Sequence, residues 1–305
     1  MIGYPTFDQL RIFLAVAEEG SFSAAGRRLN RAQSVISYGI AALEEQLGGI
    51  SLFDRTTRRP GLTAAGRVLL ADARDIALSV DGLRARARGL VRGLEGELSI
   101  AVDVMLPSDV LTDSLHALNT RYPSVGLIIH VETLGAVAEH VLNGRCAIGI
   151  SGPLPNLPDS IISQPLGMVD MVPVASPRHP LALLPPAERT IAAARRHVQI
   201  VLTDRSRLTE GRDFSVFGLE TWRIGDLGAK HALLLAGLGW GNMPAAMVAE
   251  DLAQRRLVDL GAQLGPAGPY VLSALHRADA PPGPVGQWLT GRIGAALATS
   301  HLTDV

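Results

Sequence analysis

Seven apolar residues between positions 69 and 90 are spaced alternately four and three residues apart. They are Leu69, Ala73, Ile76, Val80, Leu83, Ala87 and Leu90. This alternation is the a/d pattern of a helix that pairs with another helix, and charged residues such as Arg74, Asp75 and Arg84 flank it. We therefore expect a linker helix over residues 63–93 whose apolar seam forms a homodimer interface. The alternative is that the seam packs on the chain's own core.

The linker helix separates a basic part of the chain from an acidic one. Residues 1–93 contain 13 Arg against 9 Asp and Glu, whereas residues 94–305 contain 15 Lys and Arg against 20 acidic residues. This asymmetry suggests that only the N-terminal part contacts a polyanion such as nucleic acid. The length of 305 residues is enough for two or three domains.

The sequence shows no feature of a secreted or membrane protein. Apolar runs stay below the roughly 18 to 20 residues that span a bilayer, and the N-terminus lacks the regions of a signal peptide. The single cysteine, Cys146, excludes an internal disulfide and fits a reducing compartment. It lies in the apolar run CAIGI, which favours a buried thiol over a redox sensor. We therefore expect a cytoplasmic protein without membrane partners.

The N-terminal part has the pattern of three helices followed by two short strands. Thr6 and Gln9 have capping-box spacing before a first helix, Ser21 can cap a second, and the third falls within residues 32–48. A tight turn between the second and third helices makes a helix-turn-helix. The following segment, ISLFDRTTRRPGLT, has strand-like pieces around a basic turn. Residues 1–62 are thus predicted to form a winged helix-turn-helix domain.

The third predicted helix has one apolar stripe and an opposite face that is small and almost uncharged. Such a face can enter a DNA major groove, which is about 12 Å wide, while arginines around it contact phosphates. The candidate DNA-binding residues are Gln33, Ser34, Ser37, Tyr38 and Ala41 on the helix, with Arg27, Arg28, Arg31, Arg55, Arg58 and Arg59 around it. The alternative is a plain three-helix subdomain with a solvated face.

After residue 94, short apolar strands alternate with helices, which predicts α/β architecture with mostly parallel sheets. Two lobes are expected, lobe I over residues 94–165 and 267–305 and lobe II over residues 166–266. Ligands of such sheets bind beyond the carboxyl ends of strands, near helix N-termini. The candidate effector-binding residues at these places are Asp103, Val104, Met105, Ser108, Thr133, Ser151, Gly152, Thr203, Asp204, Arg205 and Asp226. Taken singly, each is more commonly a cap or turn residue.

Three segments carry a resemblance to a known family. LRIFLAVAEEGSFSAAGRRL, AQSVISYGIAALEEQLG and LFDRTTRRPGLTAAG, within residues 6–67, resemble the LysR-type transcriptional regulators, and the resemblance extends loosely over nearly the whole chain. It implies a winged helix-turn-helix, a dimerising linker helix and an effector domain of the type II periplasmic-binding-protein fold. It also implies binding to double-stranded promoter or operator DNA, a small-molecule effector between the lobes, and a homodimer or homotetramer.

The chain departs from many family members at five positions that bear on recognition. Ala32 stands where many have a capping Ser, Gly39 where many have Gln, and Tyr38 and Ala41 where many have basic residues. Base recognition is therefore expected to rest on hydroxyl and apolar contacts. Asp103 stands where many have Ser or Thr, and an acid there disfavours a simple carboxylate effector unless Arg205 compensates. A neutral, aromatic or cationic effector is expected.

The motifs of common enzyme classes are missing. GLGWGNMP is glycine-rich but follows a helical pattern rather than a strand, as a dinucleotide site would require. The 8 histidines have no metal-ligand spacing, Cys146 has no CxxC partner, and no G-x-S-x-G elbow occurs. We expect no catalytic residue, metal or cofactor. The alternative function is a solute-binding protein, against which the basic N-terminal part argues.

Overall fold

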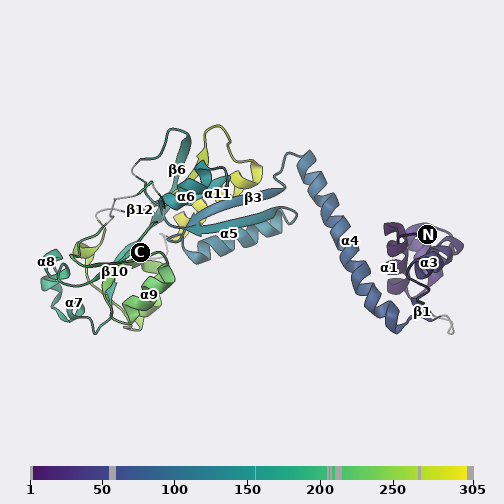
Figure 1. Ribbon diagram of the computed structural model, residues 1–305, viewed down its shortest axis with the longest axis horizontal. Helices are drawn as coiled ribbons and strands as arrows, with labels where there is room; N and C mark the ends of the chain where they lie inside the picture. Colours follow the sequence, from purple (N-terminus) through teal and green to yellow (C-terminus); the bar gives the residue numbers. More distant parts are fainter. Residues whose placement is uncertain are drawn as a thin grey trace. The chain divides into compact units, whose positions relative to one another are not determined.

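The computed structural model describes most of the chain as two compact units. The described residues are 3–54, 60–154, 156–204, 206, 208, 209, 215–266 and 269–300. The first unit spans Met1–Arg88 and the second Gly89–Val305, and each is treated by itself below (Figure 1).

The first unit begins with three helices, α1 (Phe7–Glu19), α2 (Phe22–Leu29) and α3 (Gln33–Gln46). Thr6 and Gln9 form the predicted capping box, and the Ser21 hydroxyl accepts a hydrogen bond from the amide of Ala24. Asn30 ends α2 in the left-handed conformation, with φ of 54°, and so makes the tight turn into α3. The helix-turn-helix predicted from the sequence is confirmed.

The three helices share one core, to which a two-stranded wing adds. Residues from α1, α3 and the wing, including Phe13, Ile36, Ile40, Leu43 and Phe53, are buried in it. The wing strands β1 (Phe53–Asp54) and β2 (Gly61–Leu62) pair antiparallel. The basic turn between them, with the predicted phosphate contacts Arg55, Arg58 and Arg59, lies outside the described residues.

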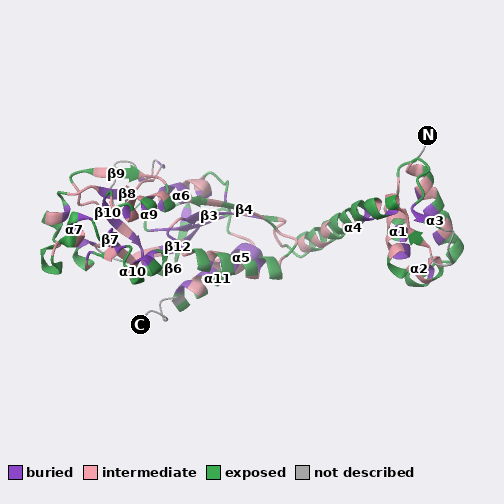
Figure 2. Cartoon of the chain, turned by 90° about the horizontal axis from the view of Figure 1, so that it is seen from below, coloured by how far each residue is buried: buried purple, intermediate pink, exposed green. Residues whose placement is uncertain are grey.

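The linker helix α4 (Ala64–Val91) begins where predicted, because the Thr63 hydroxyl accepts a hydrogen bond from the amide of Gly66. Two of its predicted seam residues, Leu69 and Ala73, pack on the chain's own N-terminal core. The later seam residues lie on a helix that is exposed along most of its length (Figure 2). Ile76, Leu83 and Leu90 are 45%, 60% and 60% exposed.

The first lobe of the second unit is built on a five-stranded sheet with the order β4-β3-β5-β12-β6. Its elements are β3 (Glu97–Asp103), α5 (Ser108–Arg121), β4 (Gly126–Glu132), α6 (Gly135–Leu142), β5 (Ile148–Ser151), β6 (Ile161–Val169), β12 (Tyr270–Arg277) and α11 (Pro284–Ser300). Helices α5 and α11 pack side by side over one core of the lobe, and α6 packs over another, which contains Cys146 (Figure 2).

The second lobe also has a five-stranded sheet, with the order β11-β7-β10-β8-β9. Its elements are β7 (Met171–Ala175), α7 (Pro180–Leu183), η1 (Pro186–Glu188), α8 (Ile191–Ala194), β8 (Gln199–Leu202), β9 (Thr221–Ile224), α9 (Leu227–Leu235), β10 (Trp240–Pro244), α10 (Ala245–Ala253), β11 (Val258–Asp259) and η2 (Ala262–Leu264). The segment GLGWGNMP contributes strand β10, whose glycines allow a close approach to β8: a Cβ at Gly241 would lie 2.6 Å from the carbonyl oxygen of Ile200.

The two lobes differ from the sequence-based expectation in strand direction and in one boundary. In the described ranges β3 pairs parallel with β4 and β5, but β12 pairs antiparallel with both β5 and β6. The sheet of lobe II also mixes both strand directions: β8 pairs parallel with β9 and β10, and β7 pairs antiparallel with β10 and β11. The expectation of mostly parallel sheets is therefore wrong. Strand β6 carries the chain from lobe I into lobe II and β12 carries it back, so these two neighbouring strands run in opposite directions. The predicted lobe boundary at residue 165 falls inside β6, which stays paired with β12 as far as Val169.

No helix in the described ranges is long and apolar enough to cross a membrane.

Candidate functional site

Helix α3, the candidate recognition helix, has one buried and one exposed face. Ile36, Ile40 and Leu43 are fully buried, whereas the side chain of Tyr38 is 77% exposed. Gln33, Ser34 and Ala41 are exposed on the same side as Tyr38, and Ser37 is half-buried. Between Gln33 and Ala41 this face carries hydroxyl, amide and methyl groups and no charged side chain, and Glu45 is exposed further along the helix.

Two of the predicted phosphate-contacting arginines lie in ion pairs within the first unit. A guanidinium nitrogen of Arg28 lies 2.5 Å from a carboxylate oxygen of Glu18 and 3.3 Å from one of Glu19. A guanidinium nitrogen of Arg31 lies 2.5 Å from a carboxylate oxygen of Asp8. These acids raise the pKa of both guanidinium groups above its ordinary value and offset their positive charge. Both arginines therefore attract a phosphate less strongly than an unpaired arginine would.

Arg27 has a different environment from these two arginines. Its guanidinium donates a hydrogen bond of 3.1 Å to the hydroxyl of Ser23, and no acid pairs with it among the described residues. Of Arg27, Arg28 and Arg31, Arg27 is therefore the one whose positive charge is not offset by an acid among the described residues.

At the junction of the two lobes, the carboxylate of Asp103 accepts four hydrogen bonds. Oδ1 accepts from the amide of Met105 at 2.8 Å. Oδ2 accepts from the amides of Leu134 at 2.9 Å and Gly152 at 3.4 Å, and from the hydroxyl of Tyr270 at 3.1 Å. Asp103 therefore ties together the ends of β3 and β5, the start of α6 and the first residue of β12.

A second carboxylate, that of Asp204, joins the lobes directly. From lobe II, its Oδ2 accepts a hydrogen bond of 2.8 Å from the amide of Gly135 at the start of α6 in lobe I. The hydroxyls of Ser206 and Thr209 also donate to Oδ2, at 2.7 and 2.5 Å, and the amide of Ser206 donates to Oδ1. A Cβ at Gly135 would lie 2.1 Å from the Ser206 hydroxyl, so only glycine permits this approach.

The backbone between these carboxylates is strained. Leu134 adopts φ of 42° and ψ of −112°, a conformation that non-glycine residues rarely take. Its amide bonds to Asp103, and its carbonyl accepts from the hydroxyl of Ser151 at 3.3 Å. Beside it, the Thr133 hydroxyl donates across the lobes to the carbonyl of Thr203 at 3.4 Å. This network holds a backbone conformation that would otherwise cost free energy.

The charge states at the junction follow from burial. Burial raises the pKa of Asp103, and the four donors oppose that rise. Burial together with the neighbouring Asp103 raises the pKa of Tyr270 well above its ordinary value. Tyr270 therefore keeps its proton at neutral pH and donates it to Asp103. Amides at helix N-termini commonly bind anionic ligands, but the first amides of α6 here already serve the protein's own carboxylates.

The structure gathers most of the predicted effector-binding residues at this junction. Asp103, Thr133, Ser151, Gly152, Thr203 and Asp204 belong to the hydrogen-bond network, and Val104 and Met105 pack against the core of lobe II. Ser108 is exposed at the start of α5, and Asp226 is an exposed cap of α9 that accepts from the amide of Ala229. These two lie outside the network, and Arg205 lies outside the described residues.

The sequence reasoning missed three polar partners at the junction and one buried cation. Tyr270 donates a hydrogen bond to Asp103, and Ser206 and Thr209 donate to Asp204. Tyr270 is the first residue of a predicted strand directly after the second lobe crossover, and this position in the sequence already points to the lobe junction. Lys230 of α9, the only lysine in the sequence, is 4% exposed, and its ammonium donates to the carbonyl of Asn242 at 2.7 Å. Burial lowers the pKa of Lys230 from 10.5 to about 8.

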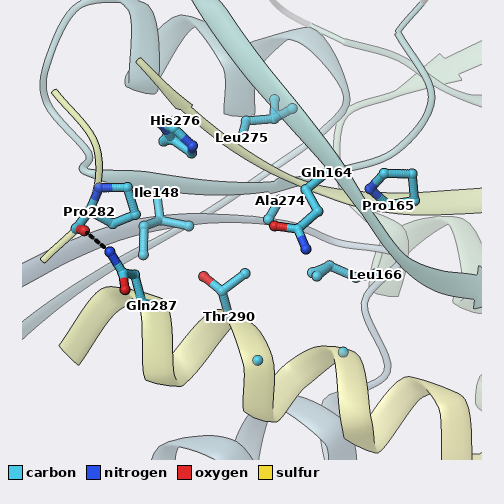
Figure 3. A pocket seen from close by; sticks show the side chains of 12 residues that line it. Ile148, Gln164, Pro165, Leu166, Ala274, Leu275, His276, Pro282, Gln287 and Thr290 are labelled. Atoms are coloured by element: carbon cyan, nitrogen blue, oxygen red, sulfur yellow. Dashed lines mark hydrogen bonds between the residues drawn. The ribbon is translucent and has the colours of Figure 1, made fainter. Parts of the chain in front are cut away.

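Lobe I also contains a cavity of about 360 Å³ between α11 and strands β6 and β12 (Figure 3). Gln164, His276, Gln287 and Thr290 give it polar walls, and the Gln287 amide donates to the carbonyl of Pro282. Among the residues that the structure describes, none of the predicted effector-binding residues lines this cavity. It is therefore a different place from the lobe junction.

Comparisons with known proteins match both units of the chain. Residues 7–67 match the family described as bacterial regulatory helix-turn-helix protein, lysR family, and residues 92–298 match the LysR substrate binding domain. The HTH-type transcriptional activator AllS of Salmonella typhimurium strain LT2 is 35% identical over 255 residues, which cover 82% of each protein. The probable HTH-type transcriptional regulator YhaJ of Escherichia coli K12 is 33% identical over 256 residues, covering 83% of this chain and 84% of that protein.

Solved structures share the fold at lower identity. A mutant of Corynebacterium glutamicum OxyR with bound hydrogen peroxide superposes with a TM-score of 0.56 at 21% identity and covers 99% of both chains. Full-length LysG of the same organism, with its effector Arg bound, superposes with a TM-score of 0.51 at 20% identity, covering 96% of this chain and 98% of that one. With a helix-turn-helix, a linker helix and a two-lobed α/β domain in one order, the chain belongs to the LysR family of transcriptional regulators.

Proposed function

We propose that the chain regulates transcription as a homodimer that reads a two-fold-related DNA site with α3 and responds to a small molecule at the lobe junction. The observation that carries the DNA-binding part is the exposed, uncharged face of α3 around Tyr38. Small side chains on a recognition helix allow close approach to base edges, and a tyrosine can contact thymine methyl groups.

Phosphate contacts would come from two sources near this face. Ala32 provides no side-chain cap to α3, so the first amides of the helix are open to a phosphate oxygen. Arg27 supplies an uncompensated positive charge next to the helix-turn-helix. Arg28 and Arg31 contribute less, because a phosphate has to compete with the acids that already pair with them.

The homodimer would form along α4. The exposed part of the seam, from Ile76 to Leu90, is apolar and lies on a helix with few contacts of its own. Pairing two such helices buries this apolar surface and brings together two recognition helices, as a two-fold-related DNA site requires.

The effector at the junction is proposed to be neutral or cationic. The amides that open α6 and follow β5 are already bonded to Asp103 and Asp204, so an anionic effector would have to displace a buried carboxylate of the same charge. A cationic or neutral hydrogen-bond-donating group meets no such repulsion from these carboxylates. Because Asp204 and Gly135 belong to different lobes, such binding alters the contact between the lobes.

The test is a gel-shift titration of the full-length protein on the DNA that flanks its own gene, with and without candidate effectors. We expect salt-sensitive binding that prefers one site, and a change in affinity or footprint with cationic or neutral metabolites but not with simple carboxylates. Binding without site preference would refute the proposed role of α3. A response to simple carboxylates alone would refute the proposed effector class.

A further inference from the structure

Three side chains with metal-binding atoms meet in lobe I, and none of them takes part in the hydrogen bonds of the lobe junction described above. His130 comes from β4, His140 from α6, and Cys146 from the segment between α6 and β5. One ligand atom of each lies within 4.8 Å of the other two. Their sequence spacing resembles no common metal motif, so only the fold brings them together.

The ring of His140 is oriented as it is in metal sites. Its Nε2 lies 3.4 Å from a carboxylate oxygen of Glu132, which favours a proton on that nitrogen. Its Nδ1 is then the atom with the lone pair, and this atom is buried without a hydrogen-bond partner among the described residues. A carboxylate behind a histidine is the usual arrangement that orients a metal ligand, and an unsatisfied buried nitrogen is costly without one.

The two other groups complete the donor set. The ring of His130 stacks on that of His140, with centroids 4.5 Å apart and an angle of 24° between the planes. Cys146 is 2% exposed, and its sulfur accepts a long contact of 3.5 Å from the hydroxyl of Ser99. Burial raises the pKa of this thiol, so it is protonated at neutral pH.

We propose that His130, His140 and Cys146 bind a divalent metal ion of the Zn²⁺ type. Two imidazoles and one thiolate are a donor set that zinc prefers, with water available for the fourth tetrahedral position. The three ligand atoms lie within 4.8 Å of one another, and rotations of the side chains bring them to zinc bonds of about 2.0 to 2.3 Å. On binding, a sulfur–metal bond forms and the thiol proton passes to solvent.

The site is separate from the proposed effector site but shares helix α6 with it. His140 lies near the end of α6, whereas the amides at its start bond to Asp103 and Asp204. A bound ion would cross-link α6 to β4 and to the segment before β5, and so stabilise the folded lobe.

The experiment uses the metal-free full-length protein and Co²⁺ as the probe, followed by displacement with Zn²⁺. We expect one Co²⁺ per chain with a thiolate-to-cobalt charge-transfer band, loss of that band when Zn²⁺ is added, and a higher thermal midpoint in the presence of Zn²⁺. Binding should strengthen as the pH rises, because the thiol must lose its proton.

Variants separate this site from adventitious binding. Cys146→Ser should abolish the charge-transfer band, His140→Ala should weaken Zn²⁺ binding by more than about 100-fold, and Glu132→Gln by about 10- to 100-fold. His116→Ala, at an exposed position on α5, is the matched control and should bind like the wild type. Circular dichroism of each metal-free variant checks that it folds. Absence of the band in the wild type, or its persistence in Cys146→Ser, would overturn the proposal.

Discussion

Replacing Lys230 tests how much its buried ammonium group lowers the free energy of unfolding. The pKa of Lys230 is lowered from 10.5 to about 8, and each pKa unit corresponds to roughly 1.4 kcal/mol. Burial of the charged form therefore costs about 3 kcal/mol at neutral pH. Lys230→Met removes this cost but leaves the carbonyl of Asn242 without its donor, which costs about 1 to 3 kcal/mol. We expect the variant to be as stable as the wild type or up to about 2 kcal/mol more stable.

The pH dependence gives the sharper result. Between about pH 8 and the unfolded pKa, the unfolded chain binds more protons at Lys230 than the folded one, so the stability of the wild type rises with pH. From about pH 7 to about pH 9.5 the wild type should gain about 2 kcal/mol relative to Lys230→Met. Lys230→Arg is the matched control: it keeps its charge throughout this range and should show no such gain.

Two measurements check this account. Because the chain has a single lysine, ¹³C-labelled lysine gives one ε-carbon signal, whose titration reports this pKa directly. Urea unfolding of the three proteins at several pH values gives the differences in the free energy of unfolding. An ε-carbon midpoint near the ordinary lysine pKa, or parallel stability curves for wild type and Lys230→Met, would refute the reasoning.

Three further substitutions test other parts of the structure. Arg27→Ala should weaken binding to all DNA sequences and reduce its salt dependence, whereas Arg28→Ala, whose charge is already paired, should have a smaller effect; equal losses in a gel-shift titration would contradict this assignment. Ile76→Glu should yield monomers by sedimentation velocity, whereas Leu78→Glu, 69% exposed but off the seam, should stay dimeric; the reverse pattern would place the interface elsewhere. Gly135→Ala should disrupt the contact between the lobes and lower stability by about 1 to 3 kcal/mol in thermal unfolding, and an unchanged midpoint would argue against that contact.

Local signals in the sequence predicted the elements that depend on neighbouring residues. The capping box at Thr6, the Thr63 cap of the linker helix and the strand at 270–277 all appear where their residue patterns indicate. Contacts between distant residues were not predictable in this way. Asp103 and Tyr270 are hydrogen-bonded although they are 167 residues apart in the sequence, and no local sequence pattern indicates this contact.

Contacts between distant residues also explain why the structure differs from the expectations for Arg28 and for the lobe boundary. Arg28 is paired with Glu18 only because α2 packs against α1, so its charge looked available in the sequence. Strand β6 contains Pro165, a residue that disfavours a strand in the sequence but is tolerated here because β6 lies at the edge of its sheet. The predicted lobe boundary at residue 165 therefore falls inside this strand.

The most direct test of the central claim is the binding of wild type and Tyr38→Ala to a set of operator variants at several salt concentrations. We expect the wild type to prefer its operator over random DNA by at least about 1,000-fold. Tyr38→Ala should change the order of preference among the variants while leaving the slope of affinity against salt concentration unchanged. An unchanged order of preference, or a loss that is equal for operator and random DNA, would contradict the claim that the exposed face of α3 reads the DNA sequence.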